Sequence, residues 1–145
     1  MSARVDLLDV NVWLALTDER HVHHQAARVY WNEQRADHIA FCRVTMLALL
    51  RLVTHPKVMS GVPFTHDEAW NIYRIYRNLP IVRFLPEANT LETTLASLTT
   101  DPDLPHRLWT DAYLAAFAIS TGNRLISFDT DFMRFPNLDL LILKA

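Results

Sequence analysis

The feature that most constrains this chain is an alternation of short apolar runs with longer amphipathic stretches. The first run, Val5–Leu8, is apolar although Asp6 interrupts it, and it passes into a helical pattern around Asp9–Asn11. The later runs of strand length are His38–Phe41, Ile81–Leu85, Leu125–Phe128 and Leu138–Leu143. Because strands that alternate with helices are typical of βαβ units, the chain is predicted to be an α/β protein with a five-stranded, mainly parallel sheet.

The stretches between these runs predict helices that flank the sheet. Thr65–Glu68 has the Thr-x-x-Glu form of a capping box, and a second cap is predicted at Asn89–Glu92. Gly122 follows the last apolar position of a helical pattern and predicts its C-terminal cap. Besides the helix that starts at Asp9–Asn11, the predicted helices cover His21–Ala36, Val44–Thr54, Thr65–Arg77, Asn89–Leu98 and His106–Thr121.

Length and composition narrow the class of protein. With 145 residues, half of them hydrophobic, residues 1–145 are predicted to form a single domain with a real core. A formal net charge of −2 excludes nucleic-acid binding through bulk positive charge, but it leaves a local basic patch open. The single cysteine, Cys42, cannot form an internal disulfide, and the sequence shows neither a signal-peptide pattern nor a long apolar span. We therefore expect a cytoplasmic protein that does not enter a membrane.

Two predicted strands end in an acidic residue. Asp9 follows the first strand and Asp129 follows the fourth, so parallel strands would bring both to the same edge of the sheet. Asp111 lies in the first turns of the helix that precedes the fourth strand, and that helix begins at the same edge. Clustered carboxylates repel one another unless they are protonated or neutralised, and hard oxygen ligands favour Mg²⁺ or Mn²⁺. A cation held in this way can support the hydrolysis of a phosphodiester bond.

Each of these acids also has a purely structural interpretation. Aspartate is common at helix starts because it accepts hydrogen bonds from exposed backbone N–H groups and interacts favourably with the helix dipole. The placement of an acid directly after a strand, which occurs twice here, favours a metal site over simple capping without excluding it.

Four segments together resemble the PIN domain, and more narrowly the VapC toxins of bacterial and archaeal toxin–antitoxin pairs. The segments are Leu7–Val12, Thr45–Arg51, Thr110–Ala116 and Leu125–Phe132. They occur in the order found in that family and span nearly the whole chain. The resemblance implies a PIN-like fold, which is a five-stranded parallel sheet flanked by helices.

The resemblance also implies an activity, which is a magnesium- or manganese-dependent endoribonuclease that cuts structured RNA such as tRNA. Asp9, Asp111 and Asp129 match the metal-binding catalytic acids of the family, and Asp131 matches an auxiliary metal-binding acid. The family leaves 5′-phosphate and 3′-hydroxyl ends. Its partner is a small antitoxin whose C-terminal segment blocks the site, and a homodimer is the expected assembly.

Three residues of the central helix bear on the strength of this site. Thr45, like Asn11, matches a polar position that lines the site in the family. The family commonly carries a glutamate where this chain has Ala48, and a methyl group cannot bind a metal. Arg51 could contact a substrate phosphate, pair with a site acid, or simply extend its charged end to solvent. The alternative to an active nuclease is therefore a catalytically weakened PIN-like module that binds RNA or a protein.

Overall fold

The centre of the protein is a parallel sheet, seen in a computed structural model that describes residues 4–144. The strands are β1 (Val5–Leu8), β2 (His38–Phe41), β3 (Val82–Phe84), β4 (Arg124–Ser127) and β5 (Leu140–Ile142). They lie in the order β3-β2-β1-β4-β5, and every neighbouring pair is parallel. Strand order reverses at β1 and β4, and the carboxyl edge of such a switch point is where open parallel sheets bind ligands.

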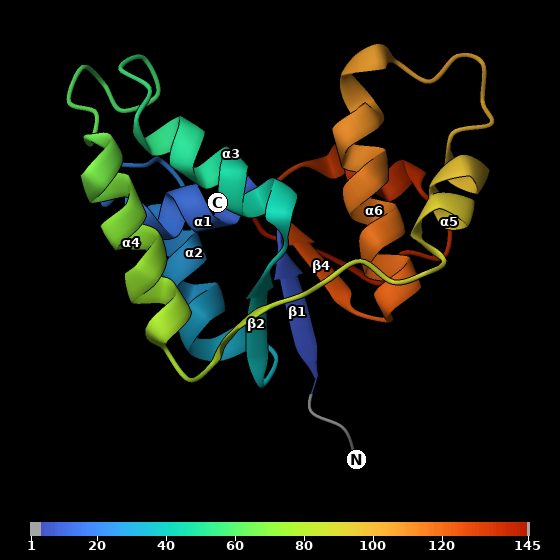
Figure 1. Cartoon of the computed structure of the whole chain (residues 1–145), viewed down its shortest axis with the longest axis horizontal. Helices are drawn as coiled ribbons and strands as arrows, with labels where there is room; N and C mark the ends of the chain where they lie inside the picture. Colours follow the sequence, from blue (N-terminus) through green and yellow to red (C-terminus); the bar gives the residue numbers. More distant parts are fainter. Residues whose placement is uncertain (1–3, 145) are drawn as a thin grey trace.

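Helices cover both faces of this sheet (Figure 1). On one face are α1 (Val10–Thr17), α2 (His24–Val29), α3 (Arg43–Val53) and α4 (His66–Asn78); on the other are α5 (Leu91–Leu98) and α6 (Trp109–Thr121). Three short helical segments, η1 (Tyr30–Gln34), η2 (His106–Leu108) and η3 (Thr130–Arg134), complete the described elements. The predicted α/β class with a parallel five-stranded sheet is confirmed.

Successive residues of β1 explain the two cores. Side chains of a strand alternate between its faces, so Leu8 enters the core under α1, α3 and α4 while Leu7 enters the core under α6. The first core is centred on Trp13, whose ring stacks on Phe41 at 3.8 Å between ring centroids. Both cores are anchored to the same central strand, which fixes the position of the residue that follows it.

Several predicted element boundaries differ from the structure. The helix predicted at His21–Ala36 starts only at His24, and it becomes the π-helical segment η1 before ending at Gln34. The helix predicted from His106 begins with a 3₁₀ turn, and α6 proper starts at Trp109. The cap predicted at Asn89–Glu92 is wrong in its chemistry, since Thr90 is the N-cap and makes no side-chain capping bond.

Two other local predictions are confirmed. Thr65 and Glu68 form the predicted capping box: the Glu68 N–H donates to Thr65 Oγ1 at 3.1 Å, and the Thr65 N–H donates to Glu68 Oε1 at 2.9 Å. Gly122 ends α6 with a φ of 71°, a left-handed conformation that glycine adopts without the steric cost of a Cβ atom.

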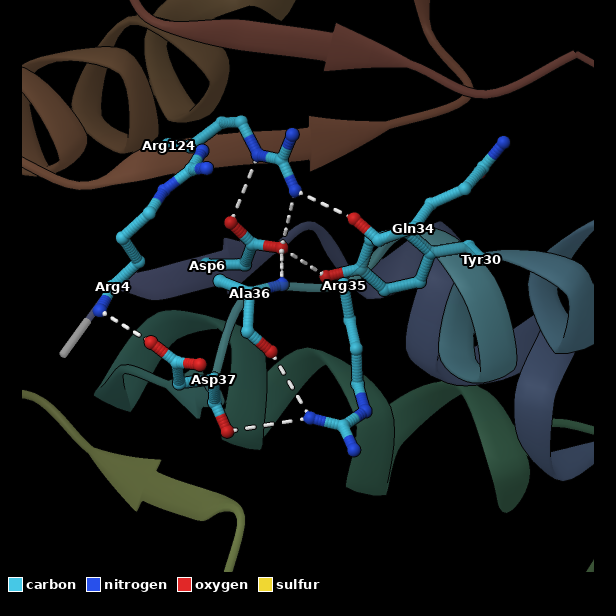
Figure 2. A network of polar contacts seen from close by, with 8 residues as sticks. All are labelled: Arg4, Asp6, Tyr30, Gln34, Arg35, Ala36, Asp37 and Arg124. Atoms are coloured by element: carbon cyan, nitrogen blue, oxygen red, sulfur yellow. Dashed lines mark hydrogen bonds and ion pairs between the residues drawn. The ribbon is translucent and has the colours of Figure 1, made fainter.

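The acid that interrupts β1 is the centre of a buried polar network (Figure 2). Asp6 is 0% exposed, and Arg124 of β4 binds both of its carboxylate oxygens, at 2.9 and 2.8 Å. The Tyr30 hydroxyl and the Ala36 N–H donate to Asp6 Oδ2 at 2.6 and 2.9 Å. Arg124 also donates to the Gln34 carbonyl at 3.0 Å. One carboxylate thus joins β1, β4 and the connection from η1 to β2.

No helix of the described residues is long and apolar enough to cross a membrane.

Replacing Arg124 with methionine is expected to destabilise the fold strongly. The substitution leaves the buried Asp6 carboxylate without its cation, and breaking a buried ion pair in this way costs about 3–5 kcal/mol. Urea denaturation at pH 7 measures the free energy of unfolding of wild type and variants. Arg35→Met is the matched control, because within the described part of the chain the Arg35 guanidinium bonds only the carbonyls of Ala36 and Asp37; a loss of about 1 kcal/mol or less is expected there. Equal losses in both variants would contradict the role given to the ion pair.

Candidate functional site

Asp9 is placed by the pairing of the two central strands. Leu8 of β1 lies opposite Ile126 of β4, and the Asp9 N–H donates to the Ile126 carbonyl at 2.9 Å. Asp9 is the N-cap of α1, where its Oδ1 accepts from the Val10 N–H at 2.7 Å. The capping interpretation is therefore correct for Asp9, and it coexists with a position at the carboxyl edge of the sheet.

Ser127, which the sequence analysis did not single out, connects the first strand end to the fourth. The Ser127 hydroxyl is buried and donates to Asp9 Oδ2 at 2.8 Å. The Ser127 Oγ atom in turn accepts from Asn11 Nδ2 at 3.2 Å and from the Asp129 N–H at 2.9 Å. Asn11 therefore reaches the acids through Ser127. The only signal in the sequence was a serine at the end of a strand, two residues before Asp129.

Three of the predicted acids meet in space. One carboxylate oxygen from each of Asp111, Asp129 and Asp131 lies within 4.8 Å of the other two. Asp111 comes from the first turn of α6, and Asp129 caps η3 by accepting from the Asp131 N–H at 2.8 Å. Asp9 is not part of this close group, although its charge acts on Asp111 and on Asp129.

The electrostatics show that these carboxylates repel one another. Burial is the largest cause that raises the pKa of Asp111 from 3.8 to about 6, and the negative charges of the other three aspartates are the next. Burial also raises the pKa of Asp9, against the opposing effect of the hydrogen bonds from Ser127 and the Val10 N–H. The cluster is thus a set of oxygen ligands that lacks sufficient positive charge.

Arg107 brings a positive charge to the cluster. Arg107, in η2, donates to Asp131 Oδ2 at 2.8 Å, and its charge lowers the pKa of Asp111 in part. Its side chain is 66% exposed, so solvent screens this pair and it neutralises the cluster only weakly. Arg107 was not predicted from the sequence because an arginine four residues before Asp111 carries no distinguishing pattern.

The donor set fits a hard divalent cation. All three candidate ligands are carboxylates, and Mg²⁺ takes oxygen ligands at about 2.0–2.1 Å. Because the three oxygens lie within 4.8 Å of one another, one ion could bind all three once the side chains move closer together. Carboxylate oxygens without sulfur or imidazole favour magnesium, manganese or calcium over zinc.

The two predicted site residues of α3 lie apart from these contacts. Thr45 is fully buried and forms a capping box with Cys42: the Cys42 N–H donates to Thr45 Oγ1 at 3.0 Å, and the hydroxyl donates to the Cys42 carbonyl at 3.1 Å. Arg51 is exposed in the last turn of α3, and in the described part of the chain its guanidinium forms no ion pair with an acid. Ala48 is half-buried.

Comparisons with known proteins agree with this architecture. The model of the PIN domain family matches residues 7–138. Ribonuclease VapC41 of Mycobacterium tuberculosis is 36% identical over 142 residues, which cover 94% of this chain and 97% of VapC41.

Two solved structures share the fold at low sequence identity. VapC20 of Mycobacterium tuberculosis, described as a sarcin-ricin loop cleaving toxin, superposes with a TM-score of 0.64 at 18% identity, covering 88% of this chain and 92% of VapC20. A toxin–antitoxin complex from Klebsiella pneumoniae gives a TM-score of 0.63 at 14% identity, covering 94% of this chain and 95% of that one.

The variant Asp111→Asn is expected to stabilise the metal-free protein above pH 6. The folded protein holds a proton on Asp111 up to about pH 6 that the unfolded chain releases near 3.8, so stability falls as the pH rises through this window and stays reduced above it. Solvent screening of the half-exposed carboxyl limits the gain to about 1 kcal/mol, or about 3 °C in Tm.

Thermal unfolding in EDTA at pH 5 and pH 7.5 measures this effect. The difference between variant and wild type should be larger at pH 7.5, and Asp103→Asn, in an exposed loop, should show no such pH dependence. A destabilised Asp111→Asn protein at pH 7.5 would contradict mutual repulsion in the cluster.

Proposed function

We propose, because this chain belongs to the PIN-domain family and gathers four aspartates at one sheet edge, that it is a metal-dependent endoribonuclease. The observation that carries the proposal is the group of Asp111, Asp129 and Asp131, whose oxygens lie within 4.8 Å of one another. The name of its relative, Ribonuclease VapC41, supports RNA as the substrate. The sarcin-ricin loop cut by VapC20 supports a structured RNA target, for which tRNA is a candidate.

Each residue has a proposed part in this reaction. Asp111, Asp129 and Asp131 would hold Mg²⁺ or Mn²⁺, and Asp9 would complete the acidic surround. Such an ion lowers the pKa of a coordinated water and polarises a phosphoryl oxygen. Ser127 fixes the rotamer of Asp9 through its 2.8 Å hydrogen bond, and Asn11 in turn holds Ser127. Thr45 supports the first turn of α3 beside the site, and Arg51 stays a candidate for phosphate contact.

We also propose an antitoxin as the physiological partner of this chain. The support is the likeness to a chain of a toxin–antitoxin complex, together with the similarity to Ribonuclease VapC41. A peptide that reaches the acid cluster with a basic side chain would neutralise the same carboxylates that bind the metal. A homodimer, the expected assembly of the family, is part of the proposal and is measured by light scattering.

Asp9→Asn is expected to reduce RNA cleavage by on the order of 10²–10³-fold, because removing one acidic group of a metal site removes several kcal/mol of transition-state stabilisation. Purified wild type is incubated with tRNA and Mg²⁺ or Mn²⁺, and the product ends are identified; 5′-phosphates and 3′-hydroxyls are expected. EDTA should abolish cleavage. Asp139→Asn is the control, because Asp139 is exposed and lies before β5. Normal cleavage by Asp9→Asn would refute the assignment.

Ala48 favours a second candidate function, a weakened PIN-like module that binds RNA or protein without cutting. Ala48→Glu restores the carboxylate that the family commonly carries, at a half-buried position of α3. If residue 48 faces the site, we expect about tenfold tighter Mn²⁺ binding by calorimetry and faster cleavage. Ala48→Gln is the matched control, with the same shape and no charge. If wild type binds no Mn²⁺ at millimolar concentration while Ala48→Glu does, the weakened module is correct.

A further inference from the structure

The charges of this chain are divided unevenly between two parts of the fold. From His38 to Pro86 the sequence has six basic residues and only two acidic ones, Asp67 and Glu68. The rest of the chain has eight basic and fourteen acidic residues. The segment from 38 to 86 comprises β2, α3, α4 and β3, so these six basic residues belong to one side of the sheet (Figure 1). The net charge of −2 conceals this separation.

Three of these arginines lie on aromatic rings. The Arg43 guanidinium sits 4.4 Å from the centre of the Phe84 ring, and Arg77 approaches the same ring at 5.2 Å. Arg74 lies 5.4 Å from the ring of Trp70. Arg77 also donates to the Tyr73 hydroxyl at 2.7 Å, which ties α4 to this row. We call these six residues the arginine–aromatic strip: Arg43, Trp70, Tyr73, Arg74, Arg77 and Phe84.

The guanidiniums of the strip keep most of their donors available. All three arginines are exposed, and among residues 4–144 none of them pairs with a carboxylate. Contact with an aromatic face leaves the N–H groups in the guanidinium plane free to bind other acceptors. Five planar donors suit the paired oxygens of a phosphate. Contact with the aromatic rings also restricts the arginine side chains before binding, so these side chains lose less conformational entropy when they bind a phosphate.

The strip begins at the edge of the sheet that carries the acids. Arg43 is the first residue of α3 and comes two residues after the end of β2, which is the neighbour of β1. Adjacent strands are ~4.8 Å apart, so the ends of β2 and β1 present Arg43 and Asp9 along one edge. From there the strip passes over Phe84, at the end of β3, to the exposed face of α4.

We propose that the arginine–aromatic strip binds the phosphate backbone of the RNA substrate at a distance from the cleaved bond. This proposal rests on the endoribonuclease function proposed above. A polyanion is the occupant that matches three guanidiniums that pair with no carboxylate of residues 4–144. The strip also starts at the acidic edge of the sheet, where the same polyanion would be cut. The acids repel phosphate in the absence of a cation, so affinity for RNA must come from elsewhere on the surface. The strip supplies it without reading sequence.

The test compares tRNA binding by three triple variants. The first, Arg43→Gln/Arg74→Gln/Arg77→Gln, removes the charges of the strip; the second replaces the same arginines with lysine. The control is Arg20→Gln/Arg28→Gln/Lys144→Gln, which changes the net charge equally but lies outside residues 38–86. Binding of fluorescently labelled tRNA is measured by anisotropy in EDTA, so that no cleavage occurs, over a range of salt concentrations.

The glutamine variant of the strip should bind tRNA about 100-fold more weakly at 0.1 M salt. The slope of its log binding constant against log salt concentration should be smaller by about two to three, because fewer counterions are released on binding. The lysine variant should recover most of the affinity, because the charge is retained. The control should lose about threefold or less, since distant charges are screened. Equal losses in the strip and control variants would overturn the proposal, since bulk charge would then explain binding.

Three further outcomes separate the alternatives. If the strip variants bind tRNA normally but change the oligomeric state, the strip joins two copies of the chain and the proposal fails. If wild type cuts RNA with Mg²⁺ and the strip variants bind tRNA normally, the proposed role of the strip is wrong while the proposed endoribonuclease function stands. If the strip binds tRNA but wild type cuts no RNA, the proposed function fails alone. Should the triple variant not fold, Arg74→Gln, whose guanidinium lies over the exposed Trp70 ring, should still lose about fivefold to tenfold.

Discussion

The buried carboxylate of Asp6 is the constraint on which the rest of the structure depends. A charge at 0% exposure is tolerated only when its lone pairs are satisfied, and here Arg124, Tyr30 and the Ala36 N–H satisfy them. These partners come from three separate parts of the chain, so the network brings β4 and the entrance to β2 to the two sides of β1. The same arrangement determines which residues lie at the other end of β1.

At that other end of β1, the carboxylates in the described part of the chain lack a buried cation like Arg124. The pairing of β1 with β4 places Asp9 beside Ser127, and among residues 4–144 the exposed Arg107 is the one cation that forms an ion pair with the acids gathered there. Burial first, and then the neighbouring negative charges, raise the pKa of Asp111, and the two hydrophobic cores must offset this unfavourable arrangement for the chain to fold. The protein thus holds a repulsive group of charges in place through packing elsewhere, which is the usual condition of a preorganised ion-binding site.

The sequence predicted the sheet well because its three central strands, β1, β2 and β4, are largely buried on both faces, and the apolar runs are bounded by clear turn and cap residues. The convergence of Asp111 and Asp129 was predictable for the same reason, since parallel strands end at one edge. What the sequence did not reveal depends on side chains that meet only in the folded state. Ser127 and Arg107 have ordinary neighbours in sequence, and their roles come from contacts with Asp9 and Asp131. The π-helical segment was likewise not predicted; it begins at Tyr30, whose hydroxyl donates to the buried Asp6 far away in the sequence.

Asp6, within β1, and Asp9, directly after β1, are three residues apart, yet they differ in where their counter-charge comes from. Asp6 receives it from within the chain, so the assembly of the sheet requires nothing from the surroundings. Within residues 4–144, the carboxylates beyond Asp9 have no buried arginine comparable to Arg124. In the metal-dependent function proposed above, the chain alone sets the amount of folded protein, whereas divalent cations set the occupancy of the acidic edge. Such a protein would stay folded without the ion and would gain activity on binding it, without refolding.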